Sequence, residues 1–537
     1  MNFADPASAL SSLSAQEAFV AAMQTPASYA ALHEVSKPIR CVETHVSWVF
    51  LTGPCAYKVK KPLRLPFLDY STAARREWLC REELRLNRRH APDLYLDTVP
   101  ISGQPGAPRV GVDEGTVFEH ALRMRQFDPD DELSHLLRRN AVTDGDIGTL
   151  AEDLARMHAE ATRADASGPF GRPAALHRVT LDNFDEIARW LPAACEVDLL
   201  RALRAHVECT FGRLQPQMEV RRRDGHVREG HGDLHCGNVV RWHGRLVAFD
   251  GLEFDPTLRF IDVANDLAFL SMDLGMHGRP DLRRTLLDRW TAVSGDYKAI
   301  ELLPYYEVYR ALVRAKVAAL QGRQHSGSAE SIALSRSYLA QAQTRTARRP
   351  PTLVAMAGLS GSGKTWLARR IAGSIGALHL RSDVERKRLA GLAPLASSHS
   401  AFDGGIYTRE FNDRTYARLL ECARACLRGG ESVVVDAASL RSVEREAFVR
   451  IAAELGARVQ LVHCVAPIEV LRERIAARHA DGRDASEATV ALLDRQPGYW
   501  EPFDAAEQEI GCVVDTTHAD QVDAAVQCLA QVAGRDA

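Results

Sequence analysis

Three polar residues near the middle of the chain have the types and the spacing that phosphoryl transfer requires. In the segment 231–238, HGDLHCGN, Asp233 and Asn238 are five residues apart, and Asp250 follows the apolar run 246–249. Asp233 can accept the proton of an attacking hydroxyl group. The side-chain oxygens of Asn238 and Asp250 are of the ligand type that Mg²⁺ binds. One base and two metal ligands together are the equipment for transferring phosphate from ATP.

A second phosphate-handling stretch lies 120 residues beyond Asn238. The apolar run 352–357 predicts a buried strand, the loop GLSGSGKT follows at once, and residues 366–372 predict a helix. This order is the full context of a P-loop, whose backbone N–H groups and helix N-terminus cradle phosphates. Lys364 is expected to reach the β- and γ-phosphate oxygens, and the Thr365 hydroxyl to bind Mg²⁺. The expected nucleotide-binding residues are Gly358, Ser360, Gly361, Ser362, Gly363, Lys364 and Thr365.

The residues between Asn238 and Asp250 predict how these two side chains meet. Residues 239–249 form the pattern of a β-hairpin with His243 and Gly244 at its turn. A hairpin returns its second strand beside its first. Asp250 is therefore expected to lie near Asn238, as joint binding of one Mg²⁺ ion demands.

A strand with two lysines and a helix with glutamates precede this segment. Lys58 and Lys60 are two apart on the expected strand 56–60, so both point to the same face. In a kinase small lobe, such a lysine binds the α- and β-phosphates, and a glutamate of the next helix holds it. The expected helix, 71–89, carries Glu77, Glu82 and Glu83. The other interpretation of these charges is a solvated surface.

The adenine end of this site is less well defined by the sequence. Strands are expected at 41–50, 94–101 and 108–119. The segment 118–124 is expected to be a hinge between two lobes, where backbone groups up to Met124 would hydrogen-bond adenine. Ahead of the lysine strand stands LTGP in place of a GxGxxG loop. The sequence therefore does not show which segment covers the triphosphate.

Three further polar residues accompany the first site. His158 lies on the apolar stripe of the expected helix 149–158, and we interpret it as a histidine satisfied by its neighbours and not as a catalytic residue. Asp262 and Asp266 are four apart on an expected helix. One of them is expected to support the segment 231–238, and the other to face solvent.

In the C-terminal part, charged residues follow predicted strands or occupy one helix face. Asp383 and Asp436 follow apolar runs, and the carboxyl ends of parallel strands face the ligand crevice. Asp436 suits the Walker-B role on Mg²⁺, and Asp383 suits binding or deprotonating a substrate hydroxyl. Each could instead cap the following helix. The helix 469–479 carries Arg474 and Arg478 on one face, as in a kinase lid or on a solvated basic helix, and Arg483 follows in a loop.

Composition narrows the remaining possibilities. The 537 residues suffice for two or three hydrophobic cores. The net charge of −3 disfavours a broad nucleic-acid or anionic-membrane surface. The eleven cysteines include no CxxC pair, which disfavours a zinc site. Without a secretory pattern at the N-terminus or an apolar run of membrane-spanning length, we expect a cytoplasmic protein.

Residues 35–345 resemble the aminoglycoside phosphotransferase-like branch of the protein-kinase fold. The matching pieces are AYKVK, REELRLN, HGDLHCGN, and FDGLEF in place of the kinase DFG. The resemblance implies an α+β domain of two lobes. It also implies that Asp233 is the catalytic base and that Asn238 and Asp250 bind Mg²⁺.

The same resemblance ranks the lysines and glutamates. Lys58 is favoured as the phosphate-binding lysine because Ala56-x-Lys58 matches the kinase Ala-x-Lys pattern, and Lys60 is second. Glu83 is favoured as its partner, with Glu82 second. Substrate choice is not carried by these motifs.

Residues 352–537 resemble the small-molecule and polynucleotide kinases of the P-loop fold, near gluconate kinase and the zeta-toxin kinases. The stretches LRSDVERKRL and VVVDAASL carry the likeness, which implies an α/β domain with a parallel sheet. The two parts in this order resemble a bacterial fusion family. The expected domains are a helical extension 1–34, a kinase-like domain 35–348 with small lobe 35–125 and large lobe 126–348, and a P-loop domain 349–537.

These features lead to one main hypothesis and two alternatives. The main one is a phosphotransferase that uses ATP and Mg²⁺ in both domains and phosphorylates hydroxyl groups of small molecules. The first alternative is a regulatory ATPase, in which the P-loop domain hydrolyses ATP and the N-terminal domain binds a partner or nucleotide without transfer. The second, a nucleic-acid kinase, is disfavoured by the net charge and by the lack of an aromatic and basic stripe.

Overall fold

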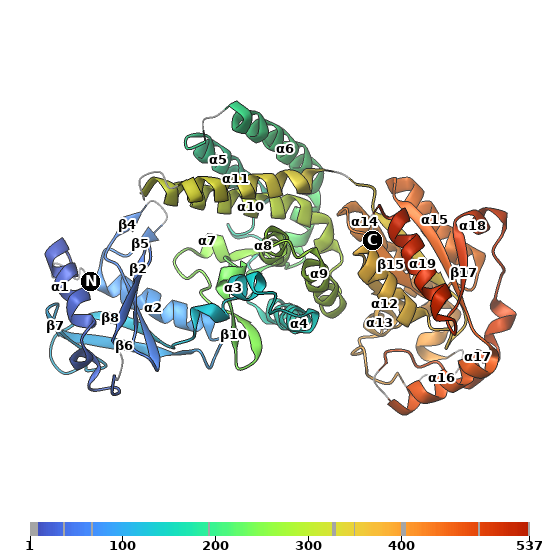
Figure 1. The fold of residues 1–537 in the computed structure, drawn as a ribbon, viewed down its shortest axis with the longest axis horizontal. Helices are drawn as coiled ribbons and strands as arrows, with labels where there is room; N and C mark the ends of the chain where they lie inside the picture. The colour runs from blue at the N-terminus through green and yellow to red at the C-terminus, as the bar shows by residue number, and fades with distance from the viewer. Residues whose placement is uncertain are drawn as a thin grey trace. The chain divides into compact units, whose positions relative to one another are not determined.

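A computed structural model describes residues 9–35, 38–65, 68–191, 194–324, 329–347, 349–398, 404–481 and 484–534 (Figure 1). The chain divides into two compact units. The first comprises residues 1–153, 157–176 and 216–273. The second comprises residues 154–156, 177–215 and 274–537. In the part of the chain that is described, no helix combines the length and the apolar character needed to cross a bilayer.

The first unit begins with a six-stranded antiparallel sheet in the order β1-β2-β3-β8-β6-β7. Its strands are β1 (Arg40–Glu43), β2 (Ser47–Leu51), β3 (Cys55–Lys60), β6 (Tyr95–Gln104), β7 (Ala107–Val110) and β8 (Val117–Arg125). The expected strand 41–50 is split, because the hydroxyl of Thr44 accepts a hydrogen bond from the N–H of Ser47 and turns the chain. The expected strand 108–119 is likewise two strands.

A helix covers each face of this sheet. The helix α1 (Leu13–Met23) packs Phe19 against the rings of Trp48, Phe50 and Phe118, with ring centroids 6.0–6.1 Å apart. The helix α2 (Ala73–Asn87) contacts β6 and β8 from the other face, toward which Lys58 and Lys60 point. The expected helical extension 1–34 thus contains the helix α1, which belongs to the apolar core beside the sheet. Figure 1 shows α1 beside β7.

The rest of the first unit holds short pairs of strands. These are β4 (Arg64–Leu65) with β5 (Leu68–Asp69), β9 (Val227–Glu229) with β12 (Phe260–Asp262), and β10 (Val239–Trp242) with β11 (Arg245–Ala248). The β10–β11 hairpin confirms the prediction, and its turn residues His243 and Gly244 have φ of 49° and 77°. Positive φ at both turn positions matches the right-handed twist of the two strands.

Helices make up most of the chain between the two main sheets. They are α3 (Leu133–Arg138), α4 (Asp144–Glu160), α5 (Pro173–Ala188), α6 (Ala194–Arg223), α7 (Pro256–Arg259), α8 (Val263–Met276), α9 (Pro280–Ser294), α10 (Lys298–Gln324) and α11 (Ala329–Thr346). The last three lie in the second compact unit, where α10 and α11 run side by side (Figure 1).

The second unit contains a five-stranded parallel sheet in the order β14-β15-β13-β16-β17. Its strands are β13 (Thr352–Ala357), β14 (Leu378–Arg381), β15 (Val433–Asp436), β16 (Arg458–Val465) and β17 (Gly511–Asp515). The strand β13, which leads into the glycine-rich loop, is central and buried throughout. Such a strand reads as a continuous apolar run because both of its faces are covered.

Helices cover both faces of the parallel sheet. On one face, α12 (Lys364–Ile375) and α19 (Ala519–Val532) pack on the apolar cluster that includes Val354, Val434 and Val462. The helices α14 (Arg409–Arg428) and α15 (Ser442–Leu455) contact the central strands as well. The remaining helices are α13 (Ser382–Leu389), α16 (Ile468–Asp481), α17 (Val490–Leu493) and α18 (Ala505–Glu509). The fold is the expected pair, a two-lobed kinase-like domain followed by a P-loop α/β domain.

Candidate active sites

The first site is built around a lysine that bridges two carboxylates. Lys58 Nζ lies 2.8 Å from Glu83 Oε1 on α2 and 2.6 Å from Asp250 Oδ1. Glu83 is completely buried, whereas the Asp250 side chain is 44% exposed. The carboxylates raise the pKa of Lys58 well above its ordinary value despite burial, which by itself lowers it. Lys58 is therefore a fixed positive charge beside an accessible carboxylate.

The second lysine of β3 has a different environment. Lys60 Nζ lies 2.6 Å from Glu83 Oε2 and also pairs with Glu253. Tyr70 donates its hydroxyl to Glu253 as well, and Lys60, Glu253 and Tyr70 are all buried. Neither Glu253 nor Tyr70 was predicted from the sequence to lie at this site. Among the described residues, the Lys60 ammonium therefore interacts only with buried groups in this cluster, Glu83, Glu253 and Tyr70. Lys58 is the lysine that reaches Asp250.

The two neighbouring glutamates of α2 are clearly distinguished. Glu83 receives both lysines, one on each carboxylate oxygen. Glu82 instead pairs with Arg85, 2.7 Å away, and with Arg259, also 2.7 Å away. The geometry thus agrees with the ranking of Glu83 over Glu82.

Asp233 and Asn238 are held together in the segment 231–238. The side-chain nitrogen of Asn238 donates to the backbone oxygen of Asp233 at 2.9 Å and to its Oδ2 at 3.1 Å. This leaves Oδ1 of Asn238 as the atom that could face a metal ion. His235 Nε2 lies 3.6 Å from Asp233 Oδ2. The Asp233 side chain is 33% exposed, so a substrate can reach it.

The hairpin brings Asp250 to the same place, as predicted. The N–H of Phe249 donates to the backbone oxygen of Asn238 at 3.0 Å. Asp250 adopts a φ of 61°, which residues other than glycine rarely do. Its N–H donates to the hydroxyl of the buried Tyr95 at 2.9 Å, and the next N–H, of Gly251, donates to Asn87 Oδ1 at 2.8 Å. Unusual backbone of this kind persists only where its surroundings enforce it.

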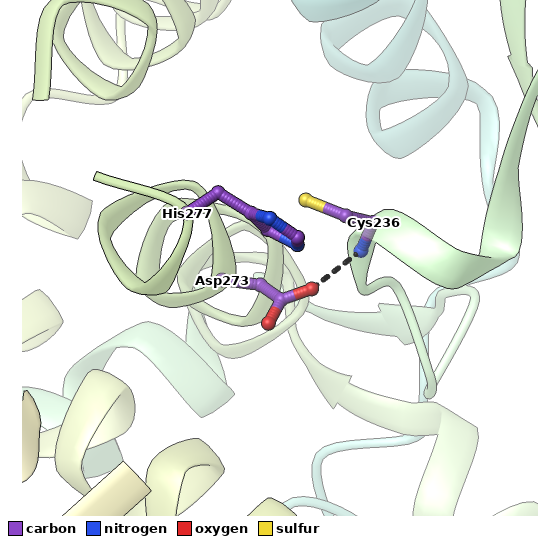
Figure 2. Close-up of side chains that lie close together, drawn as sticks. All are labelled: Cys236, Asp273 and His277. Atoms are coloured by element: carbon purple, nitrogen blue, oxygen red, sulfur yellow. Dashed lines mark hydrogen bonds between the residues drawn. The ribbon is translucent and has the colours of Figure 1, made fainter. Parts of the chain in front are cut away.

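Buried carboxylates of α8 anchor the segment 231–238. Asp266 accepts the N–H groups of His231 and Gly232 at 2.8 and 2.9 Å, and His158 Nε2 lies 3.2 Å from it. Asp266 has a lowered pKa because these partners outweigh burial, which alone would raise it. Figure 2 shows Asp273 hydrogen bonded to the N–H of Cys236, at 2.8 Å.

One expectation about this region needs correction, because neither Asp262 nor Asp266 faces solvent, and two are confirmed. Asp262 is not exposed: its carboxylate binds the guanidinium of Arg221 through contacts of 2.7 and 2.8 Å, and its residue is only 7% exposed. Asp266 is the residue that supports the loop. His158 is a buried histidine satisfied by its partner, as predicted.

The expected hinge is also misplaced. Met124 lies inside β8, between Ala56 of β3 and Tyr95 of β6, and the strand ends only at Arg125. The segment 118–124 belongs to a central strand that is paired on both sides. The connection to the helical part therefore begins at Gln126. Met124 packs in one apolar cluster with Ala56 and Val240.

The glycine-rich loop of the second unit connects β13 to α12. Gly358, Gly361 and Gly363 have φ between 81° and 134°, a region that favours glycine. Lys364 Nζ donates to the backbone oxygens of Gly358 and Leu359, at 2.8 and 2.7 Å. Burial lowers its pKa. Phosphate oxygens would compete with these carbonyls for the lysine.

Other loop groups are also held by the surrounding protein. The N–H of Ser360 donates to Gln496 Oε1 at 2.7 Å, and the Thr516 hydroxyl donates to the backbone oxygen of Ser362 at 2.9 Å. Neither Gln496 nor Thr516 was predicted from the sequence, because both are distant in the chain and belong to no motif.

Asp436 ends β15 beside the loop. Its Oδ2 lies 3.2 Å from His379 Nε2, and both side chains are buried. Although burial raises the pKa of Asp436, hydrogen bonds from His379 and Thr365 and the charge of Arg381 lower it to about 2. The cap positions of α13 and α15 are Arg381 and Arg441, so neither Asp383 nor Asp436 is a cap residue.

A cleft of about 1030 Å³ runs along this end of the sheet. Its lining includes Lys364, Thr365, Asp383 and Asp436. The wall beyond Asp383 contains Arg386, whose guanidinium donates to Ile406 O at 2.8 Å and to Asn412 Oδ1 at 2.7 Å. Other polar residues of that wall are Tyr407, Arg409, Tyr416, Arg441 and Glu444.

The two predicted lid arginines line the same cleft. Arg474 Nη1 donates to the Thr516 hydroxyl at 2.8 Å and to Gly361 O at 3.4 Å. Arg478 Nη2 donates to Ala488 O at 3.4 Å. Their shared helix α16 therefore faces the glycine-rich loop. Arg483 lies outside the described residues.

Known proteins resemble this chain over its C-terminal part and over most of its length. The family model described as AAA domain matches residues 353–503. The "Uncharacterized protein Rv2004c" of Mycobacterium tuberculosis H37Rv is 30% identical over 459 residues, which cover 86% of this chain and 90% of that protein.

Two solved structures show weaker similarity. A gluconokinase from Sinorhizobium meliloti 1021 is 24% identical and covers 35% of this chain and 96% of its own, with a TM-score of 0.25. A choline/ethanolamine kinase family protein from Mesorhizobium loti is 13% identical and covers 61% of this chain and 93% of its own, with a TM-score of 0.36.

Proposed function

The chain belongs to the same family as the mycobacterial protein Rv2004c, and we propose that it is an ATP- and Mg²⁺-dependent phosphotransferase with a separate nucleotide site in each kinase-like domain. One observation carries this proposal. Each compact unit holds, within itself, a lysine for the phosphates, oxygen ligands for a metal ion and a carboxylate suited to act as a base. A domain that only bound nucleotide would have no need of the base.

In the first unit, Asn238 Oδ1 and the Asp250 carboxylate would hold Mg²⁺. The donor set fits, because both offer oxygen and the Asp250 carboxylate is accessible. When bound, the ion would neutralise charge on the phosphates. Lys58, fixed by Glu83, binds the α- and β-phosphates, and Asp233 accepts the proton of the acceptor hydroxyl. Ala56, Met124 and the neighbouring apolar side chains are our candidates for contacts with adenine.

In the second unit, the Thr365 hydroxyl and Asp436 would hold Mg²⁺, Asp436 directly or through water. These residues fit Mg²⁺ because both offer oxygen atoms. The Asp436 carboxylate also stays ionised at neutral pH, since its pKa is lowered to about 2. Lys364, Arg474 and Arg478 face the triphosphate, and the ion would screen its charge.

The acceptor of the second site would lie at the Asp383 end of the cleft. Asp383 and Arg386 are three residues apart on α13 and therefore share a face. Among the described residues, no carboxylate forms an ion pair with Arg386, which is 8% exposed. We propose an acceptor that presents a hydroxyl group to Asp383 and an anionic group to Arg386.

The test is to make Asp233→Asn and Lys364→Ala separately in the full chain and to assay each with labelled ATP and a metabolite extract. Each variant should lose a different labelled product. The loss should be about 10²–10⁴-fold for Asp233→Asn, as expected for removal of a general base. Matched controls are Asp153→Asn and Lys298→Ala, which alter surface ion pairs with Arg245 and Glu421.

The opposite result would favour the regulatory ATPase. In that case, neither variant would change a labelled product, and Lys364→Ala would lower only the hydrolysis of ATP.

A further inference from the structure

The helix α9 lies against the edge of the parallel sheet in the second unit. The strand β14 is an edge strand, so alternate N–H groups point away from its only neighbour, β15. The N–H of His379 is one of these, and it donates to Asp288 Oδ1 of α9 at 2.6 Å. A side chain of α9 therefore satisfies a backbone group at the open edge.

The same histidine reaches the proposed metal ligand. His379 and Asp436 lie diagonally on neighbouring strands, because His379 pairs with Val434 in the register. His379 Nε2 lies 3.2 Å from Asp436 Oδ2, and the two side chains are 7% and 6% exposed. Since an ionised carboxylate can only accept, Nε2 must donate. One residue thus links Asp288 through its backbone to Asp436 through its ring.

A second contact joins α9 to the helix that carries Asp383. Arg388, at the end of α13, donates to the backbone oxygen of Val293 at 3.0 Å and also to that of Ala292. Arg418 of α14 donates to Gly295 O. The last carbonyls of a helix have no partner within it, and cations are stabilising there. The C-terminal end of α9 is therefore capped by the P-loop domain.

A buried ion-pair cluster fastens these helices in place. Arg283 of α9 lies 3.0 Å from Glu307 of α10 and 2.7 Å from Glu431, which precedes β15. Arg345 of α11 pairs with both glutamates. Burial raises the pKa of Glu431, but Arg283 and Arg345 outweigh it and lower that pKa to about 2. Removing one partner from such a cluster would leave a buried charge unpaired, which is strongly destabilising. The cluster therefore holds α9, α10 and α11 against the residues that precede β15.

We propose that His379 and Asp288 are positioning residues of the P-loop site: His379 orients the Asp436 carboxylate for metal binding, and Asp288 fixes the strand that carries His379. This inference rests on the proposed Mg·ATP site of the second unit. It makes α9, which precedes the P-loop sequence by some 60 residues, a functional part of that site. Asp288 and His379 carry no nucleotide-binding motif, and the interaction becomes visible only in the folded chain.

The experiment uses the full chain carrying Lys58→Ala, so that nucleotide binding reports the P-loop site. Binding of a fluorescent ATP analogue is measured over a range of Mg²⁺ concentrations. His379→Ala should raise the Mg²⁺ concentration for half-saturation by about 10–100-fold, the usual effect of losing a partner that orients a metal ligand. His379→Gln keeps a donor and should stay within about threefold of the parent, because the hydrogen bond is retained.

Asp288→Ala supplies a second variant that leaves the His379 ring in place. It should raise the required Mg²⁺ concentration by about three- to tenfold, the worth of one hydrogen bond. In metal-free protein, it should also speed hydrogen–deuterium exchange in residues 378–381. Asp281→Ala, on the same helix but in an exposed pair with Arg279, is the matched control and should change neither.

The outcomes separate the inference from the function on which it rests. If the Lys58→Ala parent shows no Mg²⁺-dependent binding, the proposed second site is wrong, and the inference falls with it. If the parent binds but His379→Ala, His379→Gln and Asp288→Ala all keep its Mg²⁺ dependence, the proposed site stands and the positioning role is refuted. A uniform effect of both His379 variants, with Asp288→Ala unchanged, also refutes it.

Discussion

Replacing Glu83 by Gln tests the electrostatic centre of the first site. Glu83 is completely buried and receives Lys58 at 2.8 Å on one oxygen and Lys60 at 2.6 Å on the other. Glutamine has nearly the same shape but no charge. The variant therefore leaves two buried ammonium groups with one fewer carboxylate and keeps the packing of α2.

The expected cost follows from the pKa of Glu83, which is about 2 in place of 4.5. Burial acts to raise this pKa, and Lys58 and Lys60 outweigh it. A lowered pKa means that the stabilisation is fully present above pH 4.5 and is lost as the pH falls toward 2. The gap of about 2.5 pH units corresponds to about 3 kcal/mol at neutral pH. Removing one partner from a buried ion pair costs a similar amount, about 3–5 kcal/mol.

The assay is denaturant unfolding of the full chain at pH 7, followed by hydrogen–deuterium exchange in peptides of α2 and β3. Glu83→Gln should lower the local stability of this region by about 3 kcal/mol and should abolish transfer by the first site. Glu77→Gln is the control. Its partners are the exposed Arg81, four residues away on α2, and His120, 3.7 Å away, and such a helix pair is worth less than about 0.5 kcal/mol. Equal effects of the two variants would refute the reasoning. Phosphate transfer by the first site at an unchanged rate in Glu83→Gln would refute it as well.

Two further predictions concern the second unit. Gly361→Ala should weaken Mg·ATP binding by the P-loop site more than about tenfold, because alanine at positive φ costs about 1–2 kcal/mol and its Cβ would lie 2.6 Å from Leu471 O. Gly373→Ala, where a Cβ meets nothing within 4 Å, should leave binding intact in the same titration. Glu431→Gln should lower the melting temperature of the second unit at pH 7. Because the pKa of Glu431 is lowered to about 2, this difference should persist above pH 4.5 and shrink as the pH falls below it. A difference that stays constant down to pH 3 would contradict the role given to its charge.

Spacing along the chain was enough to predict most of the first site. The hairpin 239–249 and the alternation of β3 are local patterns, and they place Asp250 beside Asn238 and both lysines on one face. The glycine-rich loop was predictable for the same reason, since its strand, loop and helix are consecutive.

The contacts that could not be predicted from the sequence join residues that are distant in the chain. Gln496 and the Asp288–His379 contact have no motif, and only the fold brings them to their sites. Glu253 lies in the FDGLEF stretch, but its pairing with Lys60 depends on the fold. Met124 was misplaced because the hinge was placed only by order along the chain, and that order does not show where the strand ends. One of Asp262 and Asp266 was expected to face solvent, because a single aspartate does not reveal that an arginine elsewhere pairs with it.

The central claim is that the two domains bind Mg·ATP independently, and calorimetric titration with a non-hydrolysable ATP analogue in the presence of Mg²⁺ tests it most directly. The full chain should bind one equivalent in each domain. Lys58→Ala and Lys364→Ala should each remove one of the two, and the double variant should remove both. A single equivalent that Lys364→Ala abolishes and Lys58→Ala leaves intact would contradict the account.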